Sequence, residues 1–310
     1  MTDQSFQAAS ADVRRQVVRL CGIHSQISLR IASDAIDQDL VSTVMFLAIS
    51  RHNLREVTRE AQSSGAYSGL DEIPPNDLRR AVSVYALAKE LGLPYETARR
   101  HATKLVAAGL CDRSDEGMVI PGQVYERGAM KAAVETNWQE TRRFLQALAA
   151  HGVRAAAPPP PDPAPGDVRR QVLRVSVEFL LDSLALLTSA IELDFLGALL
   201  AIAITRANTQ HLTEDPSAPY ASLNEMPPDA LRRPVSVYAL AKTLRLPYET
   251  TRRHVGQLTA AGLCDRTPGG GLIVPLRVVA IPSLMRGVEI NWRSTQVYLT
   301  ALAALGVVAD

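Results

Sequence analysis

The sequence predicts a mainly α-helical protein with small β-hairpins, built from two tandem copies of one unit. Residues 79–113 match residues 232–266 at a constant shift of 153, and 27 of the 35 positions are identical. A match of this length indicates an internal duplication. Apolar residues recur at helical spacing through most of the chain. The composition, 47% hydrophobic but 5% aromatic, is typical of an Ala- and Leu-rich helical core.

The duplicated segment has a clear local pattern. Ser83 is a good N-cap for a helix whose apolar residues are Val84, Leu87, Ala88 and Leu91. Gly92 then permits a tight turn, because glycine readily adopts a positive φ. Pro94 suits the first turn of a second helix, and Glu96 lies where the helix dipole favours an anion.

The second helix is expected to bury Ala98, Ala102 and Leu105, which are spaced by four and three residues. Its opposite face would carry polar and basic side chains. Residues 110–113 and 118–121 then read as two short strands around a polar turn at 114–117. The segment therefore predicts a helix, a turn, a helix with a basic outer face, and a hairpin.

Long helices are expected on both sides of this segment. The first copy should have helices at about 12–31, 34–54 and 128–150, and the second copy should end with a helix at about 283–305. The stretch 34–54 and its counterpart are apolar on most faces, which predicts central buried helices. Pro-Pro pairs at 74–75 and 227–228 would end any helix before the duplicated segment.

The copies meet at a proline-rich stretch that marks the expected domain boundary. Six prolines between 158 and 165 favour an extended polyproline II spacer. We expect a first repeat at 1–153, a linker at 154–166 and a second repeat at 167–310. Residues 1–11 are polar and are expected to be frayed.

The pattern ALAxxLGLPxxTxRRHxxxLxxAGLxxR, with the hairpin that follows it, resembles the winged helix-turn-helix of bacterial MarR-, ArsR-, IclR- and GntR-type regulators. The resemblance covers roughly 40 residues of each copy, at about 78–122 and 231–276. It implies DNA binding through the second helix. Because such regulators usually bind as two-fold dimers, it also implies an intrachain pseudo-dimer whose flanking helices form a shared core. A further homodimer remains an alternative.

Candidate DNA contacts follow from the exposed basic face and from this resemblance. Long donors near the start of a helix can read the major groove or grip phosphate. The tyrosines that open the second helices could contact DNA or pack internally, and the paired arginines before the first motif helix are candidate phosphate clamps. The predicted set is Tyr95, Glu96, Thr97, Arg99, Arg100, Thr103, Lys104, Arg113, Arg79 and Arg80 in the first copy, and Tyr248, Glu249, Thr250, Arg252, Arg253, Gln257, Arg266, Arg232 and Arg233 in the second.

Three features of the second helix and of the turn before it modify this prediction. His101 and His254 lie at the border of the buried face, so we expect hydrogen-bonded, half-buried side chains rather than base contacts. Thr103 and Lys104 become Gly256 and Gln257, so the two half-sites should differ. Gly92 becomes Arg245, which predicts a strained or reshaped turn in the second copy.

The shared core is also where the resembling families bind effectors. Arg51, Asn53, Arg206 and Asn208 occupy matching places near the end of the buried helices, and they are candidates to line an effector pocket. Helix-end capping and core hydrogen bonding are the alternative explanation, and the one we favour.

Charge is distributed in keeping with a nucleic-acid partner. The chain has a formal net charge of +1, but residues 79–113 hold seven Lys and Arg against three Asp and Glu, a net +4. Residues 232–266 have a net +5, so the remainder must carry −8. Concentrated positive charge is what a phosphate-facing surface requires.

Other functional classes find little support. The three cysteines form no CxxC pair, which argues against a disulfide framework or a zinc site, and we expect Cys111 and Cys264 to be small buried residues rather than redox sensors.

We find no phosphate loop, HExxH, GxSxG or Cys/His nucleophile pair, and predict no enzyme, metal or cofactor. The first sixteen residues have no apolar h-region, so we expect no signal peptide there, and the apolar run at 195–204 is too short to span a bilayer. We expect a cytoplasmic protein with no membrane partner.

The leading hypothesis is a sequence-specific, double-stranded DNA-binding transcriptional regulator that acts on a quasi-palindromic site, with or without a small-molecule effector. A replication-initiator or nucleoid-organising protein with tandem winged helices is the first alternative. A winged-helix scaffold that binds acidic protein partners is the second.

Overall fold

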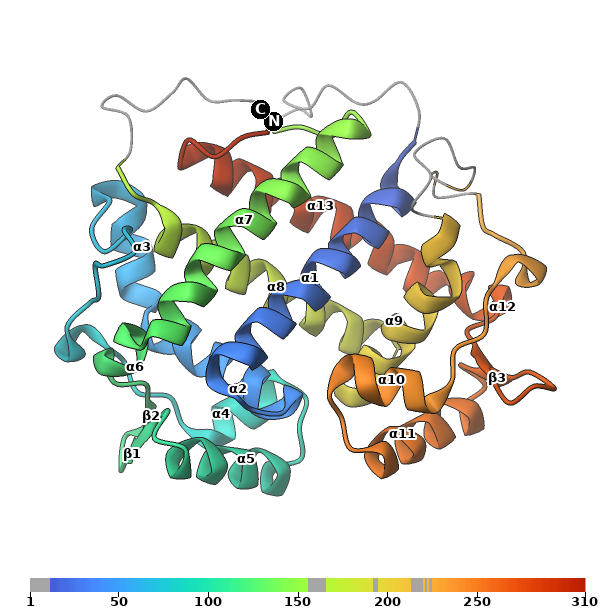
Figure 1. Cartoon of the computed structure of the whole chain (residues 1–310), viewed down its shortest axis with the longest axis horizontal. Coiled ribbons are helices and arrows are strands. Elements are labelled where there is room, and N and C mark those ends of the chain that lie inside the picture. The colour runs from blue at the N-terminus through green and yellow to red at the C-terminus, as the bar shows by residue number, and fades with distance from the viewer. Residues whose placement is uncertain are drawn as a thin grey trace.

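The protein is mainly helical, with two small antiparallel hairpins (Figure 1). The computed structural model describes residues 12–155, 166–191, 195–212, 220, 222 and 225–309. Almost all of the predicted linker, the polar N-terminal residues and Asp194 lie outside this range.

The first copy contains seven named α-helices, one 3₁₀ helix and one hairpin within the described residues. They are α1 (Arg14–Ile36), α2 (Leu40–Asn53), α3 (Arg55–Ser64), η1 (Asn76–Leu78), α4 (Val84–Glu90), α5 (Tyr95–Ala107), β1 (Asp112–Ser114), β2 (Gly117–Val119), α6 (Gly122–Glu126) and α7 (Gly128–Ala150).

The second copy repeats this order, except that the described residues at the position where α3 begins form the short 3₁₀ helix η2. Its elements are α8 (Arg169–Ile191), α9 (Phe195–Thr209), η2 (Gln210–Leu212), η3 (Asp229–Leu231), α10 (Val237–Leu244), α11 (Tyr248–Ala260), β3 (Asp265–Arg266), β4 (Leu272–Ile273), α12 (Leu276–Val279) and α13 (Pro282–Ala304).

The predicted helices are confirmed, but the boundary between the first two was misplaced, because α1 continues to Ile36 and α2 begins at Leu40 rather than at 34. The helix expected at 128–150 has those bounds, and the one expected at 283–305 is α13. Helix α2 is buried along 40–49, as its apolar faces predict. The hairpin strands are shorter than expected, and the first begins two residues later than predicted.

Four long helices from both copies form the centre of the molecule. Helix α1 packs along α7, α8 packs along α13, and α1 and α8 also contact the last helix of the other copy. Two stacked ring pairs lie in this core: His24 on Phe144 at 4.3 Å between centroids, and Phe179 on Tyr298 at 4.5 Å. Each pair joins the first and last helix of one copy, so the core repeats with the sequence.

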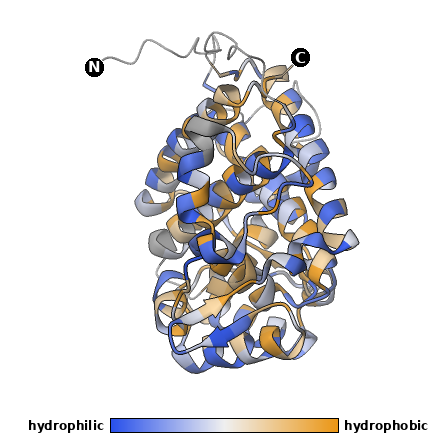
Figure 2. Ribbon diagram, turned by 90° about the vertical axis from the view of Figure 1, so that its left-hand side faces the viewer, coloured by the Kyte–Doolittle hydropathy of each residue, from blue (hydrophilic) through white to orange (hydrophobic). Residues whose placement is uncertain are grey.

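A second, larger core connects this centre to the two hairpin regions. It includes α2, α9 and the inner faces of α4, α5, α10 and α11. Apolar residues therefore line the interior, whereas hydrophilic residues appear along the outer surface and the lower edge in Figure 2. Every helix in the described part of the chain is too short or too polar to cross a lipid bilayer.

Candidate nucleic-acid interface

Helices α5 and α11 lie along the same lower edge of the molecule in Figure 1. Helix α5 buries Ala98, Ala102 and Leu105, the residues that its periodicity predicts, together with His101. Burial of this face turns the opposite face to solvent. Helix α11 does the same through Thr251, His254, Val255 and Leu258.

The turn before each of these helices has the same left-handed conformation. Gly92 has φ 60°, and Arg245, which replaces it in the second copy, has φ 51°. The second turn is therefore not reshaped. Arg245 takes the same left-handed conformation as Gly92, which is a strained conformation for a residue with a Cβ. The Arg245 guanidinium forms an ion pair with Asp34, which comes from α1 of the first copy.

Two arginines project from each exposed helix, and they differ in their partners. Arg99 contacts Glu96 at 2.8 Å, and Arg252 contacts Glu249 at 2.8 Å, each one turn earlier in its own helix. Arg100 and Arg253 are exposed, and no ion pair is found for either one among the described residues. One cation per helix is therefore available without breaking an existing contact.

The remaining predicted contacts are mostly accessible. Tyr95 and Tyr248 are 46% and 48% exposed, so they do not pack into the core. Thr97 and Thr250 are half-buried. The other exposed members of the predicted set are Glu96, Glu249, Thr103, Gln257, Arg80, Arg233, Arg113 and Arg266.

Lys104 and His101 connect α5 to the start of α2. Lys104 Nζ lies 2.5 Å from Asp39 Oδ2, and His101 Nδ1 lies 2.8 Å from the Ser42 hydroxyl. Asp39 also caps α2 by accepting a hydrogen bond from the Ser42 amide at 3.0 Å. Burial lowers the pKa of His101. The expected hydrogen bond of His101 is confirmed, although its side chain is buried rather than half-buried. Lys104 is paired with Asp39.

The prediction that Arg79 and Arg232 clamp phosphate is wrong. Both are buried, and they donate to the carbonyl oxygens of Pro74 and Pro227 at 2.9 and 3.2 Å. The Arg79 guanidinium also lies 4.9 Å from the centre of the Tyr125 ring. An arginine that packs inward cannot reach a duplex, so these two residues are structural.

The predicted pocket residues Asn53 and Asn208 are also structural. Asn53 donates to the carbonyls of Arg80 and Met118 at 2.7 and 3.1 Å and accepts from the Ile120 amide at 2.7 Å. Asn208 makes the same three bonds in the second copy, to Arg233, Leu272 and Val274. Each asparagine thus connects the end of its buried helix, α2 or α9, to the backbone of the hairpin. These bonds are the core hydrogen bonding that we favoured over an effector pocket.

Arg51 is neutralised by ion pairs with Glu90, Glu178 and Asp182, so its charge is already satisfied without a ligand. Burial alone would lower the pKa of Arg51, but these carboxylates raise it above its ordinary value. Of the four residues predicted for an effector pocket, Arg206 lines the cavity of about 240 Å³ described below, and Arg51, Asn53 and Asn208 do not line that cavity.

The hairpins place Arg113 and Arg266 beside the exposed helices but end in different turns. Gly117 is required in the first hairpin, since a Cβ there would lie 2.4 Å from the Val82 carbonyl oxygen. Asp115 and Glu116 make the first turn acidic, whereas the corresponding residues of the second turn, 267–270, carry no charge. The two copies thus differ in the hairpin as well as in the helix.

The sequence analysis did not identify Tyr85 and Tyr238, which extend from α4 and α10 and are each 69% exposed. Both copies have a tyrosine at this position although it lies outside the apolar periodicity, and that agreement could have identified them from the sequence.

The cysteines Cys111 and Cys264 are buried, as expected, and burial raises the pKa of Cys111 to about 12 and that of Cys264 to about 11.

Comparison of the chain with protein-family models, curated proteins and solved structures found no significant match. The functional argument therefore depends on the geometry of this chain alone.

Proposed function

We propose that the protein is a sequence-specific, double-stranded DNA-binding transcriptional regulator in which two winged helix-turn-helix units of one chain engage one duplex. The observation that carries the proposal is the placement of α5 and α11 on the same edge, each with an exposed arginine pair. A duplex offers successive major-groove faces on one side, so two such helices can act together.

The order of elements supports the same proposal. Helix α4, the left-handed turn, α5 and the β1–β2 hairpin follow one another, and α10, α11 and the β3–β4 hairpin repeat that order. Arg100 and Arg253 are the cations that we assign to first contact with phosphate or guanine. Arg99 and Arg252 can join them when phosphate replaces the glutamate partner.

The two units should read related but unequal half-sites. Lys104 is held by Asp39 in the first copy, and the corresponding Gln257 is a neutral hydrogen-bonding residue. The acidic hairpin turn of the first copy should also approach the phosphate backbone less closely than the uncharged turn of the second copy. We therefore expect an imperfect palindrome.

The test is selection of bound fragments from a random-sequence duplex library by the full chain, followed by footprinting and titration of the selected site at several salt concentrations. A short imperfect palindrome is expected, with an affinity that falls steeply as salt rises because bound cations are released from the phosphates. Repeated, widely spaced sites would favour an initiator or nucleoid role. Absence of any enriched site would overturn the proposal and favour a protein-binding scaffold.

A further inference from the structure

A cavity of about 240 Å³ lies between α1 of the first copy and α8, α9, α12 and α13 of the second copy. Most of its wall is apolar, including Leu29, Leu199, Val279 and Leu284. An apolar cavity of roughly 150 Å³ is large enough to hold benzene. By the same scale, this space accommodates an apolar body of roughly ten carbons.

The first copy has a tyrosine at the position that borders this space in the second. Tyr125 of α6 corresponds to Val279 of α12, because the second hairpin is one residue longer and shifts the later numbering by 154. The Tyr125 ring is buried, and its hydroxyl lies 2.7 Å from the Ser50 hydroxyl. The counterpart of Ser50 is Thr205, which borders the cavity. The smaller Val279 therefore leaves room that Tyr125 occupies in the other copy.

Arg206 has lost the carboxylates that neutralise its counterpart. Arg51 contacts Glu90 of its own copy and Glu178 and Asp182 of the second copy. The matching positions around Arg206 are Thr243 of the second copy and Ile23 and Ile27 of α1 in the first copy. Arg206 instead hydrogen-bonds to Gln26, and burial lowers its pKa. A cation thus remains at the cavity wall after its counter-charges have been replaced by neutral side chains.

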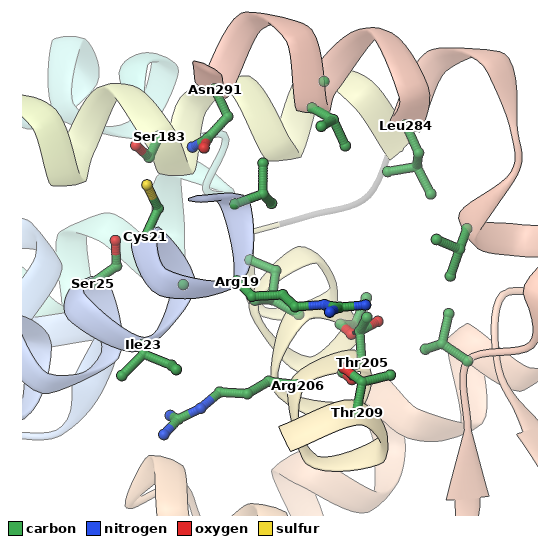
Figure 3. A pocket seen from close by; sticks show the side chains of 18 of the residues that line it. Arg19, Cys21, Ile23, Ser25, Ser183, Thr205, Arg206, Thr209, Leu284 and Asn291 are labelled. Carbon is green, nitrogen blue, oxygen red and sulfur yellow. Dashed lines mark hydrogen bonds between the residues drawn. The ribbon is translucent and has the colours of Figure 1, made fainter. Parts of the chain in front are cut away.

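Arg19 extends into the cavity itself. In Figure 3 its side chain reaches across the space between Leu284 above and Thr205 and Thr209 below. Arg19 donates to the Gln16 side-chain oxygen at 3.4 Å. The corresponding Arg174 makes the matching bond to Gln171 at 2.9 Å and, in addition, donates to the Tyr67 carbonyl at 2.9 Å. None of the described residues that line the cavity is Asp or Glu.

Burial, with the nearby charges of Arg15 and Arg232, lowers the pKa of Arg19 to about 10. Arg19 therefore remains a cation at neutral pH. Burial of this charge costs free energy, and an anion bound beside it would offset that cost. An apolar wall with a few convergent polar groups is the usual composition of a small-molecule site.

We propose that this cavity binds an organic monocarboxylate with an apolar body of roughly ten carbons, and that Arg19 holds the carboxylate. Arg206, whose side chain points away from Arg19 in Figure 3, adds positive charge to the wall without contacting the same carboxylate. Among the described residues, Tyr125 occupies the corresponding space of the first copy and acidic residues neutralise Arg51, so we expect no equivalent site there. One ligand per chain is expected. This inference does not depend on the proposed DNA binding, since ligand binding is tested without DNA.

The test is calorimetric titration of the full chain with decanoate and, as a neutral counterpart of the same length, decan-1-ol. Decanoate should bind saturably at one site per chain and at least about tenfold more tightly than the alcohol. Arg19→Gln should weaken decanoate binding by about tenfold and leave the alcohol unaffected. Arg30→Gln makes the same charge change at an exposed position of α1 that does not line the cavity, and it should change nothing.

A second variant tests the location of the site. Val279→Tyr introduces the residue that the first copy has at this position and should abolish decanoate binding without lowering the thermal unfolding midpoint. Absence of saturable decanoate binding, equal affinity for the alcohol, or full binding by a folded Val279→Tyr protein would each overturn the proposal. Unchanged binding by Arg19→Gln would remove Arg19 as the anchor and overturn it in the stated form.

Discussion

Arg14 of the first copy contacts Glu289 of the second, with 2.6 Å between Nη1 and Oε2. Its counterpart Arg169 contacts Glu135 of the first copy at 2.7 Å. The two ion pairs cross between the copies in opposite directions, which is what a two-fold arrangement within one chain requires. The first helix of each copy is thereby joined to the last helix of the other.

A double-mutant cycle on Arg14→Ala and Glu289→Ala should show a favourable coupling between the two side chains. Both are partly exposed, so we expect about 0.2–1 kcal/mol, and less at high salt. The measurement is the free energy of unfolding by urea for the four proteins. Zero coupling at low salt would show that this contact does not hold the copies together in solution.

Asn53→Ala should destabilise the protein by about 2–4 kcal/mol. The substitution leaves the Ile120 amide and two carbonyls without partners in a buried site, and desolvated polar groups are costly. The matched substitution Asn208→Ala should have a similar effect on the second copy. Urea unfolding measures both changes, and a loss below about 0.5 kcal/mol at either position would contradict the assigned role.

Arg245 permits a separation of backbone strain from ion pairing. Arg245→Ala removes the contact with Asp34 but keeps a Cβ at φ 51°, whereas Arg245→Gly also removes the strain. The glycine variant should therefore be more stable than the alanine variant by about 1 kcal/mol. The comparison uses urea midpoints, and equal stability would argue that the left-handed turn costs nothing here.

Acidification should destabilise the contact between α2 and α5. The pKa of His101 is lower in the folded chain than its ordinary value of about 6.5, because burial disfavours the imidazolium. Between these two pKa values the unfolded chain binds more protons, so His101 contributes its full stability above about pH 6.5 and loses it as the pH falls further. Unfolding midpoints measured from pH 8 to 5.5 should depend less on pH in His101→Asn than in the wild type. An unchanged pH profile would contradict this role for His101.

Removal of the glutamate partners should strengthen the proposed DNA binding. Glu96→Gln with Glu249→Gln releases Arg99 and Arg252 from contacts at 2.8 Å and removes two negative charges from the proposed interface. We expect tighter binding of the selected duplex by about twofold to fivefold, the scale of an exposed ion pair. Fluorescence anisotropy at fixed salt measures the change, and weaker binding would show that these glutamates contact the bases or position the arginines.

The helices could be predicted because their signals are local. The spacing of Ala98, Ala102 and Leu105 determined the buried face of α5, and the bounds of α7 and α13 followed from unbroken periodicity. Strand ends were less accurate because each hairpin spans only a few residues. Arg79 and Arg232 were misplaced because a run of basic residues carries no information about which side chain folds inward.

The cavity could not be predicted from composition or periodicity. Its position depends on how α1 meets α8, α9, α12 and α13. It also depends on one difference between the copies, Tyr125 in the first and Val279 in the second, which alignment alone does not mark as important. The loss of three acidic partners around Arg206 is visible in the sequence only when the contacts of Arg51 are known. Pairwise contacts between distant segments thus supplied what local patterns could not.

The most direct test of the proposed two-helix binding is titration of the selected duplex with the wild type, Arg100→Ala, Arg253→Ala and the double variant. The wild type should form a complex of one chain with one duplex. Each single variant should lose affinity, and the double variant should lose more than about tenfold, while Arg143→Ala, an exposed change on the core helix α7, should have no effect. Unchanged affinity of the folded double variant would contradict the account.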